Sequence, residues 1–281
     1  MVDRVRISFR KNRRKIMSVL FYLLVSFLAS IVGAICGIGG GVRIKPVLDL
    51  FGLDSVATIS FLSGCTVLSM SCYSVGKSML AGEKSVDLKT GTPLAVGAAI
   101  GGVWGKQLFS IIKGMSSNPS MVGGVQAACL AVITGGTLVY TLFKNRVATH
   151  KVQNVLVCVI IGLVLGILSS FLGIGGGPIN LVVLYFFFSM DTKTAAANSL
   201  YIILFSQITS LITTLITASV PQFQVLSLVV MVAGGIGGGI AGRKINKKID
   251  TAAVDKLFIG LMAVIIVISL WNTYRYLMLG G

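Results

Sequence analysis

Two clusters of glycine are the residues of this sequence whose type and spacing point to chemistry. A glycine triplet occurs twice inside apolar sequence, and its members are Gly39, Gly40, Gly41, Gly175, Gly176 and Gly177. Glycine lets a helix break and restart, and the restarted helix presents unpaired N–H groups at the positive end of its dipole. Such a helix end binds anions. The clusters therefore predict a central anion site, and close packing of helices through small residues is the alternative.

Polar residues that follow the two clusters are candidates for further contacts with the same anion. Pro178 suits the first turn of a restarted helix, where its missing N–H leaves no partner unsatisfied. Asn198 and Gln207 fall on different faces of one predicted helix, and amides within a span are expected to face protein rather than lipid. Arg43 and Lys45 either balance an anion or extend to the lipid headgroups. Apart from the glycines, the candidate binding residues are Arg43, Ser60, Ser63, Asn180, Asn198, Ser199 and Gln207.

The composition shows in which solvent these residues lie. The chain has 281 residues, of which 55% are hydrophobic and 11% are charged, and its mean hydropathy is +0.93. A soluble domain carries about 25% charged residues. A soluble enzyme, a disordered chain and a secreted disulfide scaffold are therefore excluded, and we predict an all-α polytopic membrane protein.

Apolar runs of about 20 residues, the length that crosses a bilayer, divide the chain into predicted elements. The runs of sufficient length are eight: 16–38, 56–80, 91–112, 121–143, 153–172, 194–218, 221–241 and 253–277. Two shorter runs, 42–53 and 178–190, directly follow the glycine clusters. We predict that these two are half-helices packed inside the protein, because their backbone must still be satisfied within the membrane.

The sequence repeats itself at a nearly constant offset. Residues 37–41 recur at 173–177, and residues 100–106 resemble residues 236–243. This spacing predicts two homologous membrane repeats joined by a basic linker. The predicted boundaries are a basic N-terminal segment, the first repeat, the linker and the second repeat, over 1–15, 16–143, 144–152 and 153–281. Four crossings per repeat would make the repeats parallel and five would make them inverted, and the sequence leaves both open.

A second set of glycines recurs at every fourth residue and has a different meaning. Its members are Gly97, Gly101, Gly105, Gly234, Gly238 and Gly242. Small residues at this spacing form one stripe on a helix and allow a neighbouring helix to approach closely. These glycines therefore predict helix packing rather than binding.

The charged residues indicate the environment and the type of substrate. Lysine and arginine number 24 against 8 acidic residues, and seven of the basic residues lie in the N-terminal segment 1–15. Basic flanks of apolar spans are typical of cytoplasmic loops and of contact with anionic lipids. We therefore expect a cytoplasmic N-terminus, a lipid bilayer of the cell membrane as partner, and no nucleic acid. A homo-oligomer is left open.

The acidic residues avoid the middle of the predicted spans. They lie in loops, termini or half-helices, whereas a cation pump usually needs a carboxylate in the middle of the membrane. This distribution favours an anionic or neutral substrate. The chain also has no C-x-x-C pair, a single histidine, His150, in a basic loop, and no phosphate-binding loop. We therefore expect no enzyme activity, no cofactor, no metal and no direct use of ATP.

The sequence around the glycine clusters resembles the TauE/SafE family of membrane permeases, also called sulfite exporters. The segments GAICGIGGGVRIKPVLDLFGLDSVATISFL and SSFLGIGGGPINLVVLYFFFSMDTKTAAANSL are similar to the two glycine signatures of that family. The resemblance implies a duplicated, multi-pass permease for sulfite, sulfonates, related sulfur anions or organic acids, with proton-linked coupling. It also implies that both glycine clusters, Asn198 and Ser199 lie near the pathway. Arg43 and Lys45 stand where the family is normally apolar.

Together, these features predict a secondary transporter that moves a small anion, sulfite or an organosulfonate first, by alternating access between two pseudo-symmetric halves. Export is the expected direction. A passive anion channel and a non-transporting membrane scaffold are the alternatives.

Overall fold

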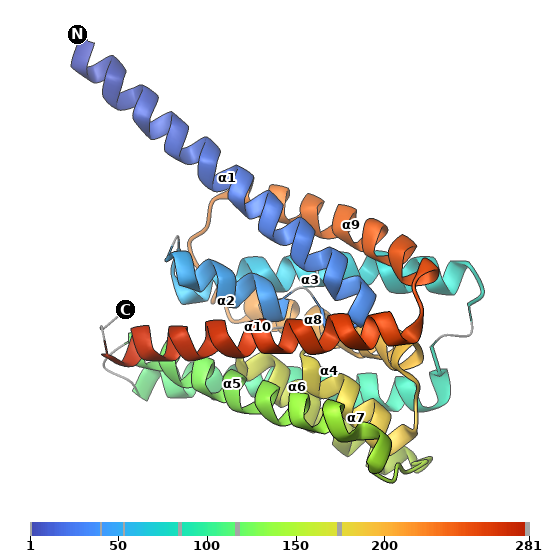
Figure 1. The fold of residues 1–281 in the computed structure, drawn as a ribbon. Coiled ribbons are helices and arrows are strands. Elements are labelled where there is room, and N and C mark those ends of the chain that lie inside the picture. Colours follow the sequence, from blue (N-terminus) through green and yellow to red (C-terminus); the bar gives the residue numbers. More distant parts are fainter. Residues whose placement is uncertain are drawn as a thin grey trace.

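The computed structural model describes residues 2–39, 41–52, 54–83, 86–115, 119–172 and 176–278, and these residues form helices and short connections without a strand. The helices of the described chain are α1 (Val2–Cys36), α2 (Gly41–Phe51), α3 (Val56–Leu80), α4 (Leu88–Met115), α5 (Pro119–Phe143), α6 (Val155–Leu172), α7 (Pro178–Phe188), α8 (Thr192–Ile216), α9 (Val225–Lys248) and α10 (Thr251–Met278), with a 3-10 turn at Lys144–Arg146. They form one bundle, from which the first part of α1 projects (Figure 1).

Eight helices of the described chain are long and apolar enough to cross a membrane. The exceptions are α2 and α7, which have 11 residues each. At 1.5 Å per residue such a helix is about 16 Å long, roughly half of the hydrocarbon core. The predicted all-helical fold with eight spans and two half-helices is therefore confirmed.

The two halves of the chain cross the bundle in opposite directions (Figure 1). α1 runs from the N-terminal end of the bundle, and α2 returns the chain to that end, since the rings of Phe21 in α1 and Phe51 in α2 lie 4.7 Å apart. α3 therefore starts at the N-terminal end, and after α4 and α5 the second half starts with α6 at the opposite end. The helices of α6–α10 follow the order of α1–α5 with reversed direction. The half-helix α2 thus decides the question that the sequence left open in favour of an inverted arrangement.

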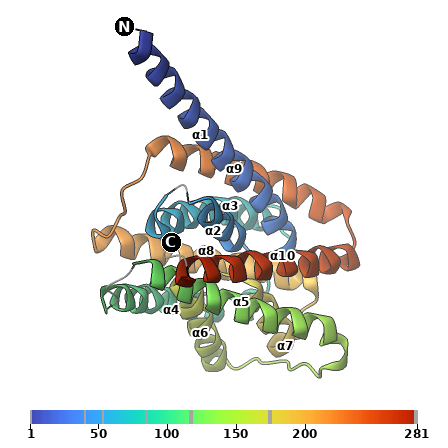
Figure 2. The ribbon, with the colours of Figure 1, turned by 60° about the vertical axis from the view of Figure 1, so that its left-hand side comes forward.

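The two halves interlock, because each contributes a helix that packs along the other half. α9 lies along α1 at one edge of the bundle, α6 pairs with α4 at the other edge, and α5 packs against α10 between them (Figure 2). The glycine stripes lie in these contacts. A Cβ added to Gly101 would be 2.1 Å from the carbonyl oxygen of Leu163, and one added to Gly238 would be 2.4 Å from that of Phe27. The prediction that these stripes serve helix packing is confirmed.

Replacing Gly101 with alanine is expected to lower the melting temperature of the detergent-solubilised protein. The added Cβ would meet the Leu163 carbonyl oxygen at 2.1 Å, so α4 must move away from α6. Overpacking of this kind costs about 1–3 kcal/mol. The matched control is Gly260→Ala in α10, where a Cβ meets nothing within 4 Å. Thermal unfolding measures both variants, and equal melting temperatures would contradict the close contact.

Candidate functional site

The two half-helices begin at chain reversals that only glycine adopts without strain. Gly37 and Gly39, before α2, both have φ of 69°, and Gly176, before α7, has φ of 96°. Residues other than glycine rarely adopt such values. A Cβ at Gly176 would also lie 2.4 Å from Ile203 of α8. The breaks thus occur where the sequence predicted them. Gly40 and Gly175 lie outside the described residues.

Each half-helix starts with backbone N–H groups that have no earlier turn to bond to. Gly41 is the first residue of α2, and Gly177 is the N-cap of α7 without a side-chain hydrogen bond to the helix. Asn180, in the first turn of α7, is buried, and its Oδ1 has no partner among the described residues. The start of α7 is therefore polar, as expected for an anion site at a helix that restarts after a glycine cluster.

Lys45 connects the first half-helix to the end of α6. Its Nζ is buried and donates hydrogen bonds to Oε1 of Gln126 at 2.6 Å and to the carbonyl of Leu172 at 3.0 Å. Gln126 in turn donates from Nε2 to the carbonyl of Phe171 at 2.6 Å. These carbonyls belong to the last turn of α6, where helix carbonyls lack partners and the dipole is negative. Lys45 therefore caps α6 and does not extend to the headgroups. The side chain of Arg43 lies outside the described residues.

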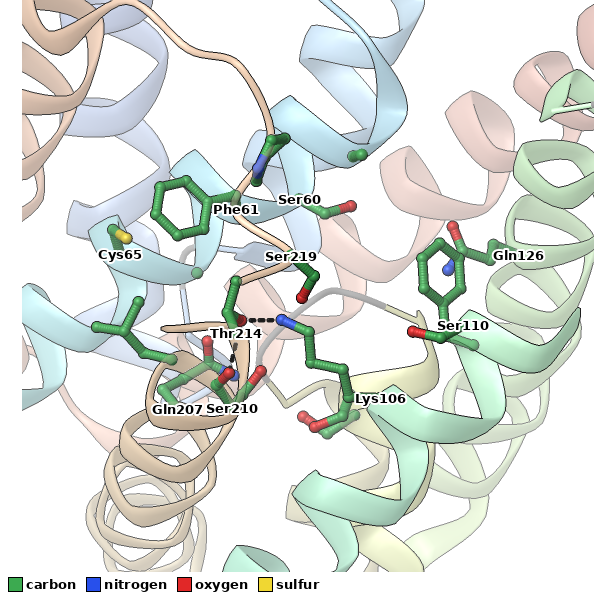
Figure 3. Close-up of a pocket in the computed structure, with 17 residues that line it drawn as sticks. Ser60, Phe61, Cys65, Lys106, Ser110, Gln126, Gln207, Ser210, Thr214 and Ser219 are labelled. Carbon is green, nitrogen blue, oxygen red and sulfur yellow. Dashed lines mark hydrogen bonds between the residues drawn. The ribbon is translucent and has the colours of Figure 1, made fainter. Parts of the chain in front are cut away.

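A cavity of about 160 Å³ opens beside this cap, between α3, α4, α5, α6 and α8. We call it the Lys106 pocket (Figure 3). Its lining is rich in groups that donate hydrogen bonds, and none of the lining residues that the structure describes carries a carboxylate. The polar lining residues are Ser60, Lys106, Ser110, Gln126, Ser169, Ser170, Gln207, Ser210, Thr214 and Ser219.

Lys106 gives this pocket its charge. Its side chain crosses from α4 to α8, where Nζ donates a hydrogen bond to the hydroxyl of Thr214 (Figure 3). None of the ion pairs in the described part of the chain involves Lys106. Nearby, the hydroxyl groups of Ser60, Ser169 and Ser170 are buried without a hydrogen-bond partner among the described residues. A cation without a carboxylate, surrounded by unpaired hydroxyl donors, suits an oxyanion.

The candidate binding residues are distributed over three environments. Ser60 and Gln207 line the Lys106 pocket. Ser63 of α3 and Ser199 of α8 are fully buried, and their hydroxyl groups have no partner in the described chain. Asn198 is used in a structural contact, since its Oδ1 accepts from the backbone N–H of Asp87 at 3.1 Å and its Nδ2 donates to the carbonyl of Thr194 at 2.9 Å. The chain before α4 is thereby attached to α8.

The sequence pattern does not predict Lys106 as a site residue, because Lys106 stands at the end of a packing motif. The repeat itself contained the signal. Residues 100–106 and 236–243 both end in a basic residue, Lys106 in the first half and Arg243 in the second. A cation at the end of both glycine stripes is unexpected for packing alone, since charges within spans are costly.

Arg243 lines a second cavity of about 480 Å³, which we call the Arg243 pocket. Both cavities lie against α3 and α8, at opposite ends of these two helices. The lining of the Arg243 pocket on α8 comes from residues 193–200, whereas the Lys106 pocket uses residues 207–214 of that helix. Between the two pockets lie three side chains that are at most 1% exposed: Met70 of α3 and Ile202 and Ile203 of α8. The two pockets are thus separated by packed side chains.

An ion-pair network occupies the Arg243 pocket. Glu83, in the connection after α3, accepts from Nη2 of Arg243 at 2.8 Å and from Nζ of Lys247 at 2.7 Å. The hydrogen bond from Lys247 is the largest cause that lowers the pKa of the Glu83 carboxyl below its ordinary value. Arg243 also donates from Nη1 to the carbonyl of Ser74 at 2.8 Å.

Comparison with known proteins agrees with this architecture. The model of the family described as sulfite exporter TauE/SafE matches residues 22–269. The chain belongs to this family. A similar protein, the probable membrane transporter protein YunE of Bacillus subtilis (strain 168), is 24% identical over 255 residues, which cover 85% of this chain and 92% of that protein. No solved structure matches.

Family membership and the eight apolar helices identify a multi-pass membrane transporter of the cell membrane, with a lipid environment and a small-molecule substrate. A transporter family is also consistent with the expectation that the protein is not an enzyme. The resemblance seen in the two glycine signatures is therefore confirmed over most of the chain.

Replacing Lys45 with methionine is expected to destabilise the fold, because the carbonyl of Leu172 and Oε1 of Gln126 lose their donor. Hydrogen bonds to charged groups contribute about 1.5–3 kcal/mol. The control is Lys244→Met, an exposed lysine of α9. The melting temperatures of both variants test this, and a Lys45→Met protein as stable as the control would show that the cap contributes nothing.

Proposed function

We propose that the protein is a secondary transporter for a small oxyanion, with sulfite or an organosulfonate as the first candidates, and that the anion binds in the Lys106 pocket. The observation that carries this proposal is a lysine in a hydroxyl-lined cavity whose described lining has no carboxylate. Within a bilayer such a cation is costly unless an anion or a set of dipoles compensates it. A substrate that brings both negative charge and several acceptor oxygens satisfies this requirement.

The chemistry of the lining agrees with an oxyanion rather than a neutral solute. Lys106 supplies a charge-assisted hydrogen bond, and Ser60, Ser169 and Ser170 supply hydroxyl groups without other partners in the described chain. Charge-assisted hydrogen bonds are about twice as strong as neutral ones. The cavity of about 160 Å³ has room for a small anion with some of its hydration water. Gln207 adds an amide, which binds either a sulfonate oxygen or a hydroxyl group.

Alternating access is the mechanism that this arrangement supports. The Lys106 and Arg243 pockets lie at opposite ends of α3 and α8, and the buried side chains of Met70, Ile202 and Ile203 separate them. Since the halves have inverted directions, an exchange of their conformations would open one pocket as the other closes. A passive channel would need a continuous path, and the buried side chains between the two pockets block such a path.

The glycine breaks have a place in this mechanism. Ile203 contacts Gly176, and Ser199 lies one helical turn before Ile203 on the same face of α8. We infer that Ser199, Asn180 and the N-terminus of α7 meet the anion between the two pockets. The triplets Gly39–Gly41 and Gly175–Gly177, with Ser63 and the basic Arg43, complete the proposed pathway. Export and proton-linked coupling follow from the likeness to the family and belong to the same proposal.

Replacing Lys106 with methionine is expected to reduce sulfite flux in proteoliposomes by about 10- to 100-fold, since charged hydrogen bonds contribute about 1.5–3 kcal/mol. Lys106→Arg keeps the charge and is expected to retain part of the flux. The matched control is Lys256→Met, an exposed lysine of α10, which should transport as the native protein does.

The same assay separates the proposed transporter from its alternatives. Saturable uptake that is stimulated by anion on the opposite side indicates a transporter, whereas unsaturated flux indicates a channel. Absence of flux for sulfite, sulfonates and carboxylates alike would favour a membrane scaffold. Unchanged flux in the Lys106→Met protein would contradict binding in this pocket.

A further inference from the structure

The Lys106 and Arg243 pockets are built from equivalent positions of the two halves. Lys106 and Arg243 are 137 residues apart, and each ends a glycine stripe. Glu83 and Ser219, which line the Arg243 and the Lys106 pocket respectively, are 136 residues apart and follow α3 and α8. Each pocket therefore pairs a basic residue from a glycine-striped helix with a residue from the equivalent connection.

The equivalent pockets differ in the residue that stands opposite the cation. In the Arg243 pocket the Glu83 carboxylate accepts from Nη2 of Arg243 at 2.8 Å, from Nζ of Lys247 at 2.7 Å and from the hydroxyl of Ser78 at 3.1 Å. In the Lys106 pocket this position is Ser219, which lies beside Lys106 and Thr214 (Figure 3). A neutral hydroxyl therefore replaces a carboxylate that is held by two cations and a hydroxyl group.

The donors around Glu83 are the kind of donors that recognise a free oxyanion. Guanidinium, ammonium and hydroxyl groups converge on two oxygens of one carboxylate. Arginine recognises carboxylate, phosphate and sulfonate oxygens in the same manner. Glu83 is also the only carboxylate among the described lining residues of this pocket. Without its charge, Arg243 and Lys247 would lack an anionic partner there.

We propose that the Arg243 pocket is a second binding site for a small oxyanion and that Glu83 is a tethered competitor, which the substrate must displace. This inference rests on the proposed function and extends it to the opposite side of the protein. Because Glu83 is attached to the end of α3, it competes at an effective concentration of the order of millimolar or above. The apparent Kd for an anion from this side is therefore the intrinsic Kd divided by the fraction of protein in which Glu83 is displaced. The lining residues described for the Lys106 pocket include no such competitor, so the two sides differ in apparent affinity.

Anion binding to the purified full-length protein tests this inference. Isothermal titration calorimetry is carried out on the Lys106→Met protein, in which the Lys106 pocket lacks its cation. The probes are sulfite and methanesulfonate. The Lys106→Met protein is expected to bind weakly, and addition of Glu83→Gln should tighten binding by roughly tenfold or more. Addition of Arg243→Met to this double variant should abolish the gain.

Two further variants extend the test, and the second of them does not disturb the ion pairs of Glu83. Glu83→Ser introduces the residue found at position 219 and should tighten binding as Glu83→Gln does. Ser219→Glu, in the otherwise native chain, introduces a carboxylate beside Lys106 and should weaken anion binding in the Lys106 pocket by roughly tenfold or more. This last variant leaves the ion pairs of Glu83 intact.

The outcomes separate this inference from the proposed function. If Lys106→Met weakens sulfite binding but neither Glu83 variant restores it, Glu83 has only a structural role, and the inference is overturned while the proposed function stands. If Lys106→Met leaves binding and flux at native levels, the proposed function fails. A gain in the Glu83 variants that requires Arg243 would then still support the second site.

Discussion

Close contact between the backbones of the two halves is the constraint on which the rest of this structure depends. In a bilayer, helices gain little from burial of apolar side chains against each other, because lipid is equally apolar. Here the contact is made by glycines, such as Gly101 against α6 and Gly238 against α1. Each stripe ends in a basic residue, so the packing that joins the halves also places Lys106 and Arg243 beside α8 and α3. Architecture and site are therefore consequences of the same contact.

Charge balance distinguishes the two sides of the molecule. Lys106 meets only neutral groups among the described residues of its pocket, whereas Arg243 shares a carboxylate with Lys247. A desolvated cation needs compensation, and the two pockets obtain it differently: one from hydroxyl and amide dipoles, the other from an acid of the same chain. Under the proposed function, this difference in charge gives the two sides of the protein different apparent affinities for the anion.

The broken helices are stabilised by groups from neighbouring helices. Lys45 of α2 satisfies the last carbonyls of α6, and Ile203 of α8 lies against Gly176 before α7. A helix end within a membrane is tolerated only where protein groups satisfy its backbone. The sequence predicts that Lys45 binds an anion or extends to the headgroups, but in the structure Lys45 has a structural role. The cation of the pocket is Lys106.

The sequence by itself determined the solvent, the eight spans, the two half-helices, the packing stripes and the family, because each of these depends on composition, run length or local spacing. The tertiary structure decided the rest. Whether the half-helix α2 returns the chain to the side it came from depends on packing, and this return makes the halves inverted. Ser60, Lys106 and Gln207 come from three helices, and no local pattern shows that they face one cavity. Likewise, the burial of Lys45 depends on the position of α6, which is remote in sequence. Periodicity describes one helix at a time, whereas a site between helices exists only once their contacts are formed.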